Sequence, residues 1–398
     1  MIGQELRSQG LGSASQQIVA SKGAFGQAVS RTLRARIRAR AQGQTAPGGT
    51  QLEIEEIPQA RRAEFDAFVG AHIWGDVLQG WAWGDVKGAF GWHPHRFLLH
   101  EYGQVIGALS VLRREVPVFG EILYAPRGPV LDPGKRGTWR DFSRLLRRRF
   151  PRAFAFVCEP RIDEEMKRPP RFWRGRRRGL FQGIQPRIVA EIPLSGNLER
   201  DFERLHPKCR YNVRLAERRG IATRKGETAD RSTFLRLLQI TARRDGFHLR
   251  ASRFYSEVLR AFADAGQAAL LLAGRGDEDY AGVFAVRLGR HAIYLYGASD
   301  GAGRRDMAAY ACQWAAIRWA EECGAERYDM TGMAPSDARH PLSGLRRFKM
   351  QWGAVERRYI GPLDLPLRLP NYLLYRLAEP LVARLSLWRQ RFVARPAQ

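Results

Sequence analysis

The sequence lacks the features of secreted and membrane-spanning proteins. Its 398 residues contain four cysteines, none in a CxxC pair, so neither a disulfide framework nor a cysteine metal site is indicated. No window approaches the roughly 18 consecutive apolar residues of a transmembrane helix, and the first twenty residues have no continuous apolar core. We therefore expect a cytoplasmic protein whose cysteines are small, buried apolar residues in a reducing compartment.

Acidic residues are scarce relative to basic ones. There are 66 Lys and Arg against 40 Asp and Glu, which gives a formal charge of +26. Such a field concentrates polyanions near the surface, so nucleic acid, anionic lipid and phosphorylated substrates are the first candidate partners. The charge does not distinguish among them. A hydrophobic fraction of 44% with 11% aromatic residues indicates a folded chain, long enough for two or three domains.

Residues 1–50 have the composition of a disordered basic tail. They are rich in Gly, Ser, Gln, Ala and Arg, and they end in a basic run followed by a Pro/Gly linker. Such a segment cannot bury a core. It is either a solvated tail (or the product of a misplaced start codon) or an arm that adds charge to RNA or membrane binding.

From Leu52 onward one order of elements occurs twice. A hairpin pattern with a turn at Tyr102-Gly103 is followed by a strand, a helix and a buried strand, and the same order returns between residues 268 and 330. This order predicts an α/β fold of acetyltransferase type, with mixed central sheets. We place the two domains at residues 51–190 and 191–363. The loops at Tyr124–Asp132 and Tyr296–Gly303 then occupy equivalent places.

The C-terminal extension, residues 364–398, mixes Leu, Tyr, Trp and Phe with arginines. This pattern is typical of an interfacial amphipathic helix, here interrupted at Pro380. A helix that packs back on the domain with a basic outer face would show the same pattern, because long basic side chains also cover apolar surface.

A strongly basic helix is predicted at Leu205–Ile221. Cys209, Val213 and Ala216 form its apolar face. Its cations are Lys208, Arg210, Arg214, Arg218 and Arg219. Three interpretations compete: a solvated charged face, a contact with nucleic acid, and a clamp for the phosphates of a small substrate. Arg210 and Arg214 share one face at i,i+4 spacing, and the planar guanidinium suits phosphate oxygens.

Four stretches carry the candidate chemistry: "LQGWAWGDVKGAFGW" at 78–92, "YAPRGPVLD" at 124–132, the basic helix, and "HPLSGLRRFKMQWG" at 340–353. Together they resemble the Fem family of peptidoglycan-bridge aminoacyltransferases, from about Leu52 to Asp364. Shorter matches are "QPR" at 185–187, "TARRDGF" at 241–247, "YLYGAS" at 294–299 and "GPLDLPL" at 361–367. The short interval between "TARRDGF" and Ala281 resembles the family members that lack a coiled-coil arm.

The resemblance implies two acetyltransferase-like (GNAT-type) domains in tandem. It also implies transfer of an amino acid from aminoacyl-tRNA to the stem-peptide side-chain amine of UDP-MurNAc-pentapeptide or lipid II. Because the ester of the charged tRNA is already activated, no cofactor and no metal are expected. We expect a monomer, and the basic C-terminus favours the lipid-linked acceptor and peripheral contact with the inner membrane leaflet.

For the reacting ester, the resemblance implies a role for the Phe348-Lys349 pair, which we expect in a loop. Lys349 would stabilise the oxyanion or contact a tRNA phosphate, and Phe348 would stack on the terminal adenosine. The alternative is a strand edge with an exposed lysine. The family's Phe-Gly pair after the lysine is replaced here by Trp352-Gly353. Asp132 is the candidate general base, although an aspartate after a Pro/Gly loop is also a common turn former.

For the precursor, the resemblance implies a site built on both domains. Its phosphates would be held by the basic helix and by a lysine of the first domain, and Phe254 is the alternative to the tyrosine beside it. The expected residues are Lys87, Tyr124, Arg127, Lys208, Arg210, Tyr211, Arg214 and Tyr255.

Two other functions remain open. An acyl-CoA N-acyltransferase of the same superfamily would need a pyrophosphate-binding glycine turn at a helix N-terminus, and "GASDGAGRRD" at 297–306 departs from that spacing. A non-catalytic RNA-binding protein would account for the charge, but the aromatic motifs of RNA-binding modules are not recognisable.

Overall fold

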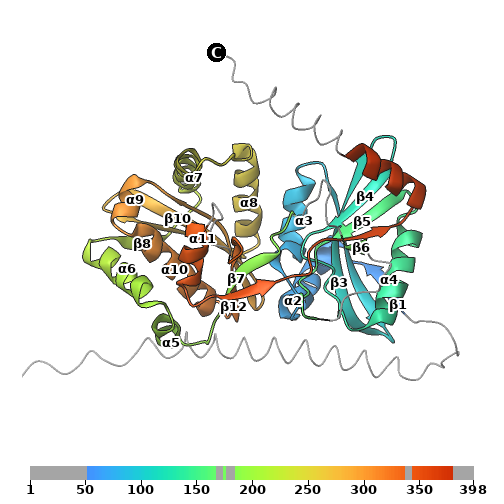
Figure 1. The fold of residues 1–398 in the computed structure, drawn as a ribbon, viewed down its shortest axis with the longest axis horizontal. Coiled ribbons are helices and arrows are strands. Elements are labelled where there is room, and N and C mark those ends of the chain that lie inside the picture. Colours follow the sequence, from blue (N-terminus) through green and yellow to red (C-terminus); the bar gives the residue numbers. More distant parts are fainter. Residues whose placement is uncertain (1–51, 167–173, 176–183, 337–342, 380–398) are drawn as a thin grey trace, which may run out of the picture. The chain divides into compact units, whose positions relative to one another are not determined.

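The computed structural model describes residues 52–166, 174–175, 184–336 and 343–379, and most of them belong to two seven-stranded sheets with their helices (Figure 1). The predicted N-terminal tail and residues 380–398 lie outside the described residues. The first part of the chain contains, in order, β1 (Leu52–Glu56), η1 (Gln59–Arg61), α2 (Arg62–Ala71), η2 (Val77–Gln79), α3 (Trp81–Gly88), β2 (His93–Glu101), β3 (Gln104–Val116), β4 (Gly120–Ala125), α4 (Arg136–Arg149), β5 (Ala153–Cys158) and β6 (Arg174–Gly175).

The second part continues with the strand that opens the second sheet and ends with a strand that returns to the first. Its elements are β7 (Ile188–Pro193), α5 (Leu198–Glu203), α6 (Pro207–Arg218), β8 (Ala222–Lys225), α7 (Arg231–Asp245), α8 (Ser252–Asp264), β9 (Ala268–Arg275), β10 (Glu278–Leu288), β11 (His291–Ser299), α9 (Gly301–Arg305), α10 (Ala308–Glu322), β12 (Arg327–Gly332), α11 (Ser343–Met350), β13 (Val355–Arg358) and β14 (Leu363–Pro366).

The repeated order predicted from the sequence is present in both sheets. The first sheet has the order β1-β2-β3-β4-β5-β14-β6, and the second has β13-β7-β12-β11-β10-β9-β8. In each, three successive strands are neighbours, and a helix then leads to a parallel fourth strand: α4 connects β4 to β5, and α10 connects β11 to β12. The loops after β4 and β11 are therefore topologically equivalent, as expected.

The chain passes between the sheets twice. β7 already belongs to the second sheet, so the predicted boundary at residues 190/191 falls inside this strand. β14 pairs with β5 and β6 of the first sheet, so the predicted C-terminal extension begins inside a strand. These exchanges join the two halves of the chain through backbone hydrogen bonds as well as through side chains.

Buried contacts connect the two sheets. One hydrophobic cluster contains Trp81 and Leu98 from the first part of the chain together with Phe254 and Leu288 from the second. Beside it, the buried Arg161 guanidinium donates to Asp76 (3.3 Å), to the Glu191 carboxylate and to the Tyr359 hydroxyl (2.7 Å). A buried arginine needs this many partners to offset its desolvation. The network therefore fixes how the two sheets meet.

The structure also bears on the cysteines and on the C-terminal segment. Cys158, Cys209 and Cys312 are buried free thiols as predicted, whereas Cys323 is half-buried.

Residues 369–379 are helical and pack back on the first sheet, one of the two predicted alternatives. Within the described ranges, no helix has the length and hydrophobicity needed to cross a membrane.

Candidate functional site

A pocket of about 210 Å³ is lined by residues from both halves of the chain. α3, the following turn and β4 contribute one wall, and α8, β11 and the end of β12 contribute the other. The lining residues are Leu78, Trp83, Lys87, Trp92, Tyr124, Ile184, Gln185, Arg250, Phe254, Ile293, Leu295, Tyr296 and Thr331. An apolar and aromatic lining with a few convergent polar groups is typical of a small-molecule site.

Lys87 lies in this pocket inside an aromatic cage. Its Nζ atom is 5.9 Å from the ring centres of Trp83 and Trp92 and 6.0 Å from that of Phe254. Burial, together with the positive charges of Arg250 and Arg114, lowers the pKa of Lys87 to about 8. A bound anion would raise the pKa of Lys87 again, because a nearby negative charge favours the charged form of the lysine.

Two arginines complete a cationic cluster around Lys87. Arg250 lines the pocket, and its guanidinium carbon lies 4.8 Å from the Phe254 ring centre. The Arg114 guanidinium lies 5.6 Å from the ring centre of Trp92. Lys87 and Arg250 line the pocket, and Arg114 lies beside the lining residue Trp92. Such a group of cations suits a ligand with several anionic oxygens, such as a pyrophosphate. Neither arginine was predicted from the sequence, and Arg250 lies in the loop just before α8, the helix that carries Phe254.

Tyr124, on β4 in the same wall as Lys87, is held by a buried carboxyl. Its hydroxyl donates to Glu159, and Glu159 also accepts a hydrogen bond from the Gln185 backbone N–H (3.1 Å). Burial raises the pKa of Glu159, against the opposing effect of the Tyr124 hydrogen bond. Glu159 directly follows β5, so it is a charged residue at the end of a buried parallel strand. α/β proteins commonly place ligand-binding groups at that position. Glu159 was not predicted from the sequence, although its place after a buried strand indicates such a role.

Lys349 binds a residue of the pocket lining. Its Nζ atom donates to Thr331 Oγ1 (3.1 Å) and to the Gly332 carbonyl (2.6 Å), and Thr331 lines the pocket. Lys349 is only 3% exposed, and burial lowers its pKa to about 8 while the Asp329 carboxylate acts in the opposite direction. The lysine lies on α11 and not in the predicted loop, and the alternative of an exposed lysine at a strand edge is wrong.

Backbone strain marks the same position. Thr331 has a φ of +64°, a left-handed conformation that costs energy for a β-branched residue. The Asp329 carboxylate stabilises this turn by accepting a hydrogen bond from the Thr331 backbone N–H (2.6 Å). The strained turn places the Thr331 hydroxyl and the Gly332 carbonyl where they bind the ammonium group of Lys349.

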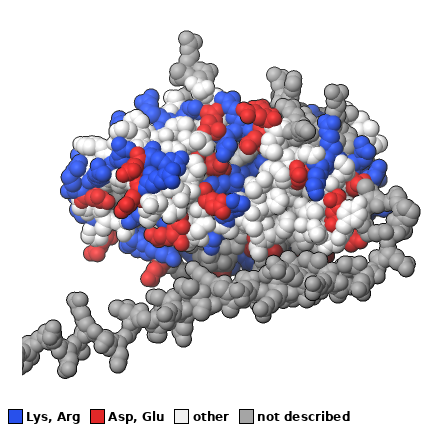
Figure 2. All heavy atoms as spheres, turned by 90° about the horizontal axis from the view of Figure 1, so that it is seen from below, with Lys and Arg blue, Asp and Glu red and all other residues white. Residues whose placement is uncertain are grey.

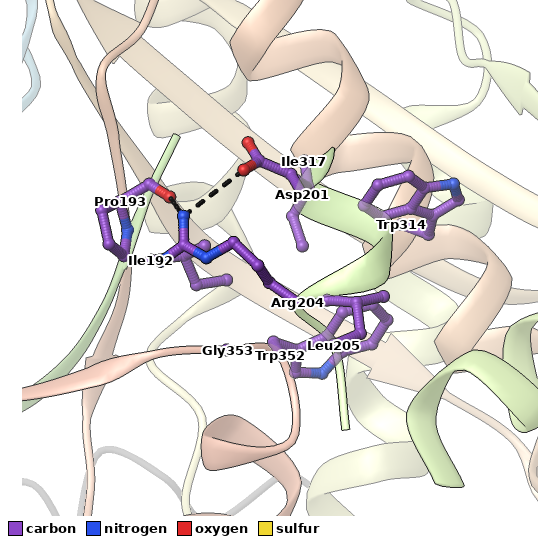
Figure 3. Close-up of a pocket in the computed structure, with 9 residues that line it drawn as sticks. All are labelled: Ile192, Pro193, Asp201, Arg204, Leu205, Trp314, Ile317, Trp352 and Gly353. Atoms are coloured by element: carbon purple, nitrogen blue, oxygen red, sulfur yellow. Dashed lines mark hydrogen bonds and ion pairs between the residues drawn. The ribbon is translucent and has the colours of Figure 1, made fainter. Parts of the chain in front are cut away.

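Phe348 and Trp352 pack around α11. The half-buried Phe348 ring meets Tyr310 edge-on at 5.4 Å and Trp352 at 5.9 Å. Trp352 is fully buried and lines a second, much smaller cavity of about 10 Å³, shown in Figure 3. That cavity has room for about one water and is not a substrate site. The Trp352-Gly353 departure from the family pattern therefore lies in the core that supports α11.

The basic helix α6 is not part of the pocket lining. Its buried face is the predicted one, with Cys209, Val213 and Ala216 at most 2% exposed. The Arg210 guanidinium donates to the Glu203 and Leu205 carbonyls (2.6 Å each). The Arg214 guanidinium stacks 5.3 Å from the Phe202 ring centre. Lys208 and Tyr211 are exposed. The structure therefore does not bring α6 together with Lys87, as a shared phosphate clamp would require.

The remaining predicted residues do not line the pocket. The Asp132 carboxylate accepts a hydrogen bond from the Gly134 N–H (2.7 Å), which is the turn-forming alternative for this residue. Buried Arg127 donates to the Pro186 carbonyl (3.0 Å) and stacks on Tyr359, so it supports the segment that carries Gln185. Tyr255 packs edge-on against Tyr296 behind the lining, whereas its neighbour Phe254 faces the pocket.

Charge alone does not mark a second site. Lys and Arg side chains are spread over the face shown in Figure 2, with Asp and Glu between them. In the described part of the chain, no group of three His, Cys, Asp or Glu side chains is arranged to hold a metal ion.

Comparison with known proteins identifies similar sequences and folds. The sequence profile of the FemAB family matches residues 60–167, 152–275 and 267–380. The lipid II:glycine glycyltransferase of Staphylococcus aureus (strain USA300) is 24% identical over 405 residues, which cover 81% of this chain and 95% of that protein. The crystal structure of FemX superposes with a TM-score of 0.73 at 24% identity, covering 82% of this chain and 100% of FemX.

Proposed function

Because the chain belongs to the FemAB family, we propose that it transfers an amino acid from aminoacyl-tRNA to the stem-peptide side-chain amine of a peptidoglycan precursor. Family membership confirms the resemblance inferred from the motifs. One observation carries the proposal: the pocket that Lys87 and Arg250 line is also lined by Thr331, whose hydroxyl binds the buried ammonium group of Lys349. This arrangement combines a binding site for a phosphorylated acceptor with a cation for an acyl-transfer step.

The acceptor would bind through its pyrophosphate. Lys87, Arg114 and Arg250 would hold the phosphate oxygens, and the aromatic walls formed by Trp83 and Trp92 would exclude water from the contacts. The S. aureus relative is named for lipid II, a precursor that carries a pyrophosphate. Tyr124, held by Glu159, offers a hydroxyl to the glycopeptide part.

The chemical step would be aminolysis of an ester. The amine nitrogen attacks the ester carbonyl carbon, a C–N bond forms, and the C–O bond to the terminal ribose breaks. The proton of the amine leaves with the ribose hydroxyl. Negative charge develops on the carbonyl oxygen, and the Lys349 ammonium would stabilise it, an effect worth about 3–4 kcal/mol for one preorganised donor.

The RNA part of the donor would lie along α6. The backbone N–H of His206, just before α6, donates to the carbonyl of Gln351, just after α11 (2.9 Å). The exposed cations of α6 therefore start next to the helix that carries Lys349. Phosphate contacts from such cations supply much of the affinity of proteins for RNA and make it dependent on salt. This assignment replaces the phosphate clamp predicted from the sequence.

The double substitution Lys208→Ala/Arg214→Ala is expected to raise the KM for aminoacyl-tRNA about tenfold and to lower the salt dependence of tRNA binding. The KM for the precursor should stay constant. Arg210 is left in place because it bonds backbone carbonyls. The matched control is Arg140→Ala/Arg148→Ala, on exposed positions of α4. A larger rise in the KM for the precursor than in the KM for aminoacyl-tRNA would instead support the phosphate clamp predicted from the sequence.

The pH dependence follows from the two lysines. Both have a pKa lowered to about 8, so they are mostly charged at pH 7 and lose their charge as the pH rises above 8. We expect kcat/KM for the precursor to fall on the alkaline side with an apparent pKa near 8. Lys87→Arg, which stays charged, should reduce the alkaline rise in KM. A profile that keeps increasing to pH 10 would contradict the requirement for charged lysines.

The proposal is tested against its two alternatives by supplying different donors. Purified protein would be incubated with the precursor and either charged tRNA or acetyl-CoA. We expect consumption of aminoacyl-tRNA only in the presence of the precursor. Consumption of acetyl-CoA would favour the acyl-CoA transferase. RNA binding without turnover of either donor would favour the RNA-binding protein.

A further inference from the structure

The helix at residues 369–379 carries its apolar side chains outward. Its exposed residues are Leu369 (51%), Leu373 (47%), Leu374 (60%) and Leu377 (78%). At 100° per residue these leucines, with exposed Pro370 among them, cover an arc of about 140°. A surface helix of a globular protein normally turns its apolar face to the core. The outward leucine face is therefore unexplained by folding.

The opposite face already anchors the helix. The Tyr375 ring lies 4.8 Å from the Phe154 ring centre and 5.4 Å from that of Phe119. The buried Tyr372 hydroxyl donates to Asp364 (2.8 Å). The leucines are thus exposed on a helix that is firmly packed, and a contiguous apolar patch of this kind marks an interaction surface.

The helix packs on the same side of the first sheet as the pocket. Tyr372 and Tyr375 belong to a hydrophobic cluster that includes Tyr124, with Trp92 packed against it. Tyr124 and Trp92 both line the pocket. Figure 1 shows the helix, in red, beside β4, the strand that ends with Tyr124 and Ala125. A partner on the leucine face would therefore lie on the flank of the protein that contains the phosphate-binding cations.

Positive charge accompanies the leucine face. Arg368 precedes the helix and is exposed. Arg376 lies at the edge of the face, where it also pairs with Asp364 (3.8 Å) and Glu379 (3.7 Å). The sequence of residues 380–398 contains four arginines and no acidic residue. Leucines flanked by arginines are suited to the boundary between acyl chains and anionic headgroups, where both kinds of side chain are satisfied.

We propose that the leucine face of residues 369–379 docks on an anionic lipid bilayer and so presents the pocket to a lipid-linked precursor. The choice of acceptor rests on the proposed function. In a lipid-linked precursor the pyrophosphate adjoins the lipid, so a pocket that binds it has to come within reach of the headgroups. A bilayer contact beside the pocket satisfies that requirement. A soluble nucleotide-linked precursor does not impose it.

Vesicle sedimentation of the full chain tests the docking step. The vesicles contain phosphatidylcholine with about one third phosphatidylglycerol. Leu373→Ser/Leu374→Ser/Leu377→Ser is expected to lower vesicle affinity at least about tenfold, because three apolar contacts with the bilayer are lost. Leu377→Ser alone, at the most exposed position, should give a smaller loss in the same direction. The matched control is Ile73→Ser/Val355→Ser, which changes exposed apolar residues elsewhere and should leave vesicle binding unchanged.

Transfer assays test the consequence for the acceptor. The triple variant should transfer to the precursor in vesicles at least about tenfold more slowly, at unchanged rate to the nucleotide-linked precursor. Equal vesicle binding by wild type and triple variant would overturn the proposal. So would a dimer in lipid-free solution that the triple variant converts to monomers, or new exposure of residues 1–51 to protease in that variant. Absence of transfer to either acceptor would count against the proposed function alone, because vesicle binding is measured without substrate.

Discussion

Lys349→Met is expected to lower kcat for aminoacyl transfer by roughly 10²–10³-fold, the loss seen when one preorganised oxyanion donor is removed. Methionine has nearly the same length as lysine and keeps the apolar contacts of α11, but it brings no charge to Thr331 and Gly332. The KM values for both substrates should change much less than kcat. The measurement is single-turnover transfer at saturating precursor, which reports the chemical step directly.

The control for this substitution has to separate chemistry from folding. Lys349 is buried, and replacing a buried ammonium by an apolar side chain removes its desolvation cost. The Thr331 hydroxyl and the Gly332 carbonyl lose this donor, so the melting temperature of the variant has to be measured to show that it is folded. Lys225→Met, at an exposed lysine of β8, should leave kcat unchanged. A normal kcat for Lys349→Met would show that Lys349 does not stabilise the oxyanion. A large rise in the KM for tRNA alone would indicate that Lys349 binds a tRNA phosphate.

The double substitution Lys87→Ala/Arg250→Ala is expected to have the second large effect, a loss of affinity for the precursor. A charge-assisted hydrogen bond contributes about 1.5–3 kcal/mol, so each substitution should lower the affinity for the precursor by about ten- to a hundredfold. The two losses need not add, because both cations face one pocket. Affinity for aminoacyl-tRNA and single-turnover kcat at saturating precursor should change little. Calorimetry with the nucleotide-linked precursor measures the loss.

A simpler ligand isolates the phosphate contacts. Inorganic pyrophosphate should compete with the precursor in the wild type and should fail to compete in the double variant. Lys225→Ala/Arg236→Ala removes the same two charges from exposed positions of the second half of the chain and should not alter precursor affinity. If the double variant bound the precursor normally, the aromatic cage around Lys87 would have a structural role.

Local sequence patterns predicted most of the elements but not how distant strands pair. The hairpins, the two long crossover helices and the buried strands β5 and β12 were predicted, because alternation and helical periodicity are local signals. The return of β14 to the first sheet was not. Its partners are more than 180 residues away along the chain, and "LDLP" has the same pattern whichever sheet it joins.

Site residues that belong to a family motif were predicted from the sequence. Site residues that are brought to the pocket only by the tertiary structure were not. Lys87 and Lys349 were identified through the family resemblance; Lys87 lines the pocket, and Lys349 binds the lining residue Thr331. Arg250 was missed because the resemblance in its stretch of sequence was used only for Tyr255 and its neighbour Phe254. The basic residues of α6 were assigned to the precursor because a cationic helix has the same sequence pattern for any polyanion. Its position relative to Lys87 is a property of the tertiary structure.

The most direct test of the account is a mass measurement on the acceptor after incubation with the protein and charged tRNA, one amino acid at a time. We predict that one or more aminoacyl residues appear on the side-chain amine of the stem peptide, with one charged tRNA consumed per residue added. Fragmentation of the product identifies the modified nitrogen. An unchanged precursor with every charged tRNA, or a modification elsewhere on the molecule, would contradict the account.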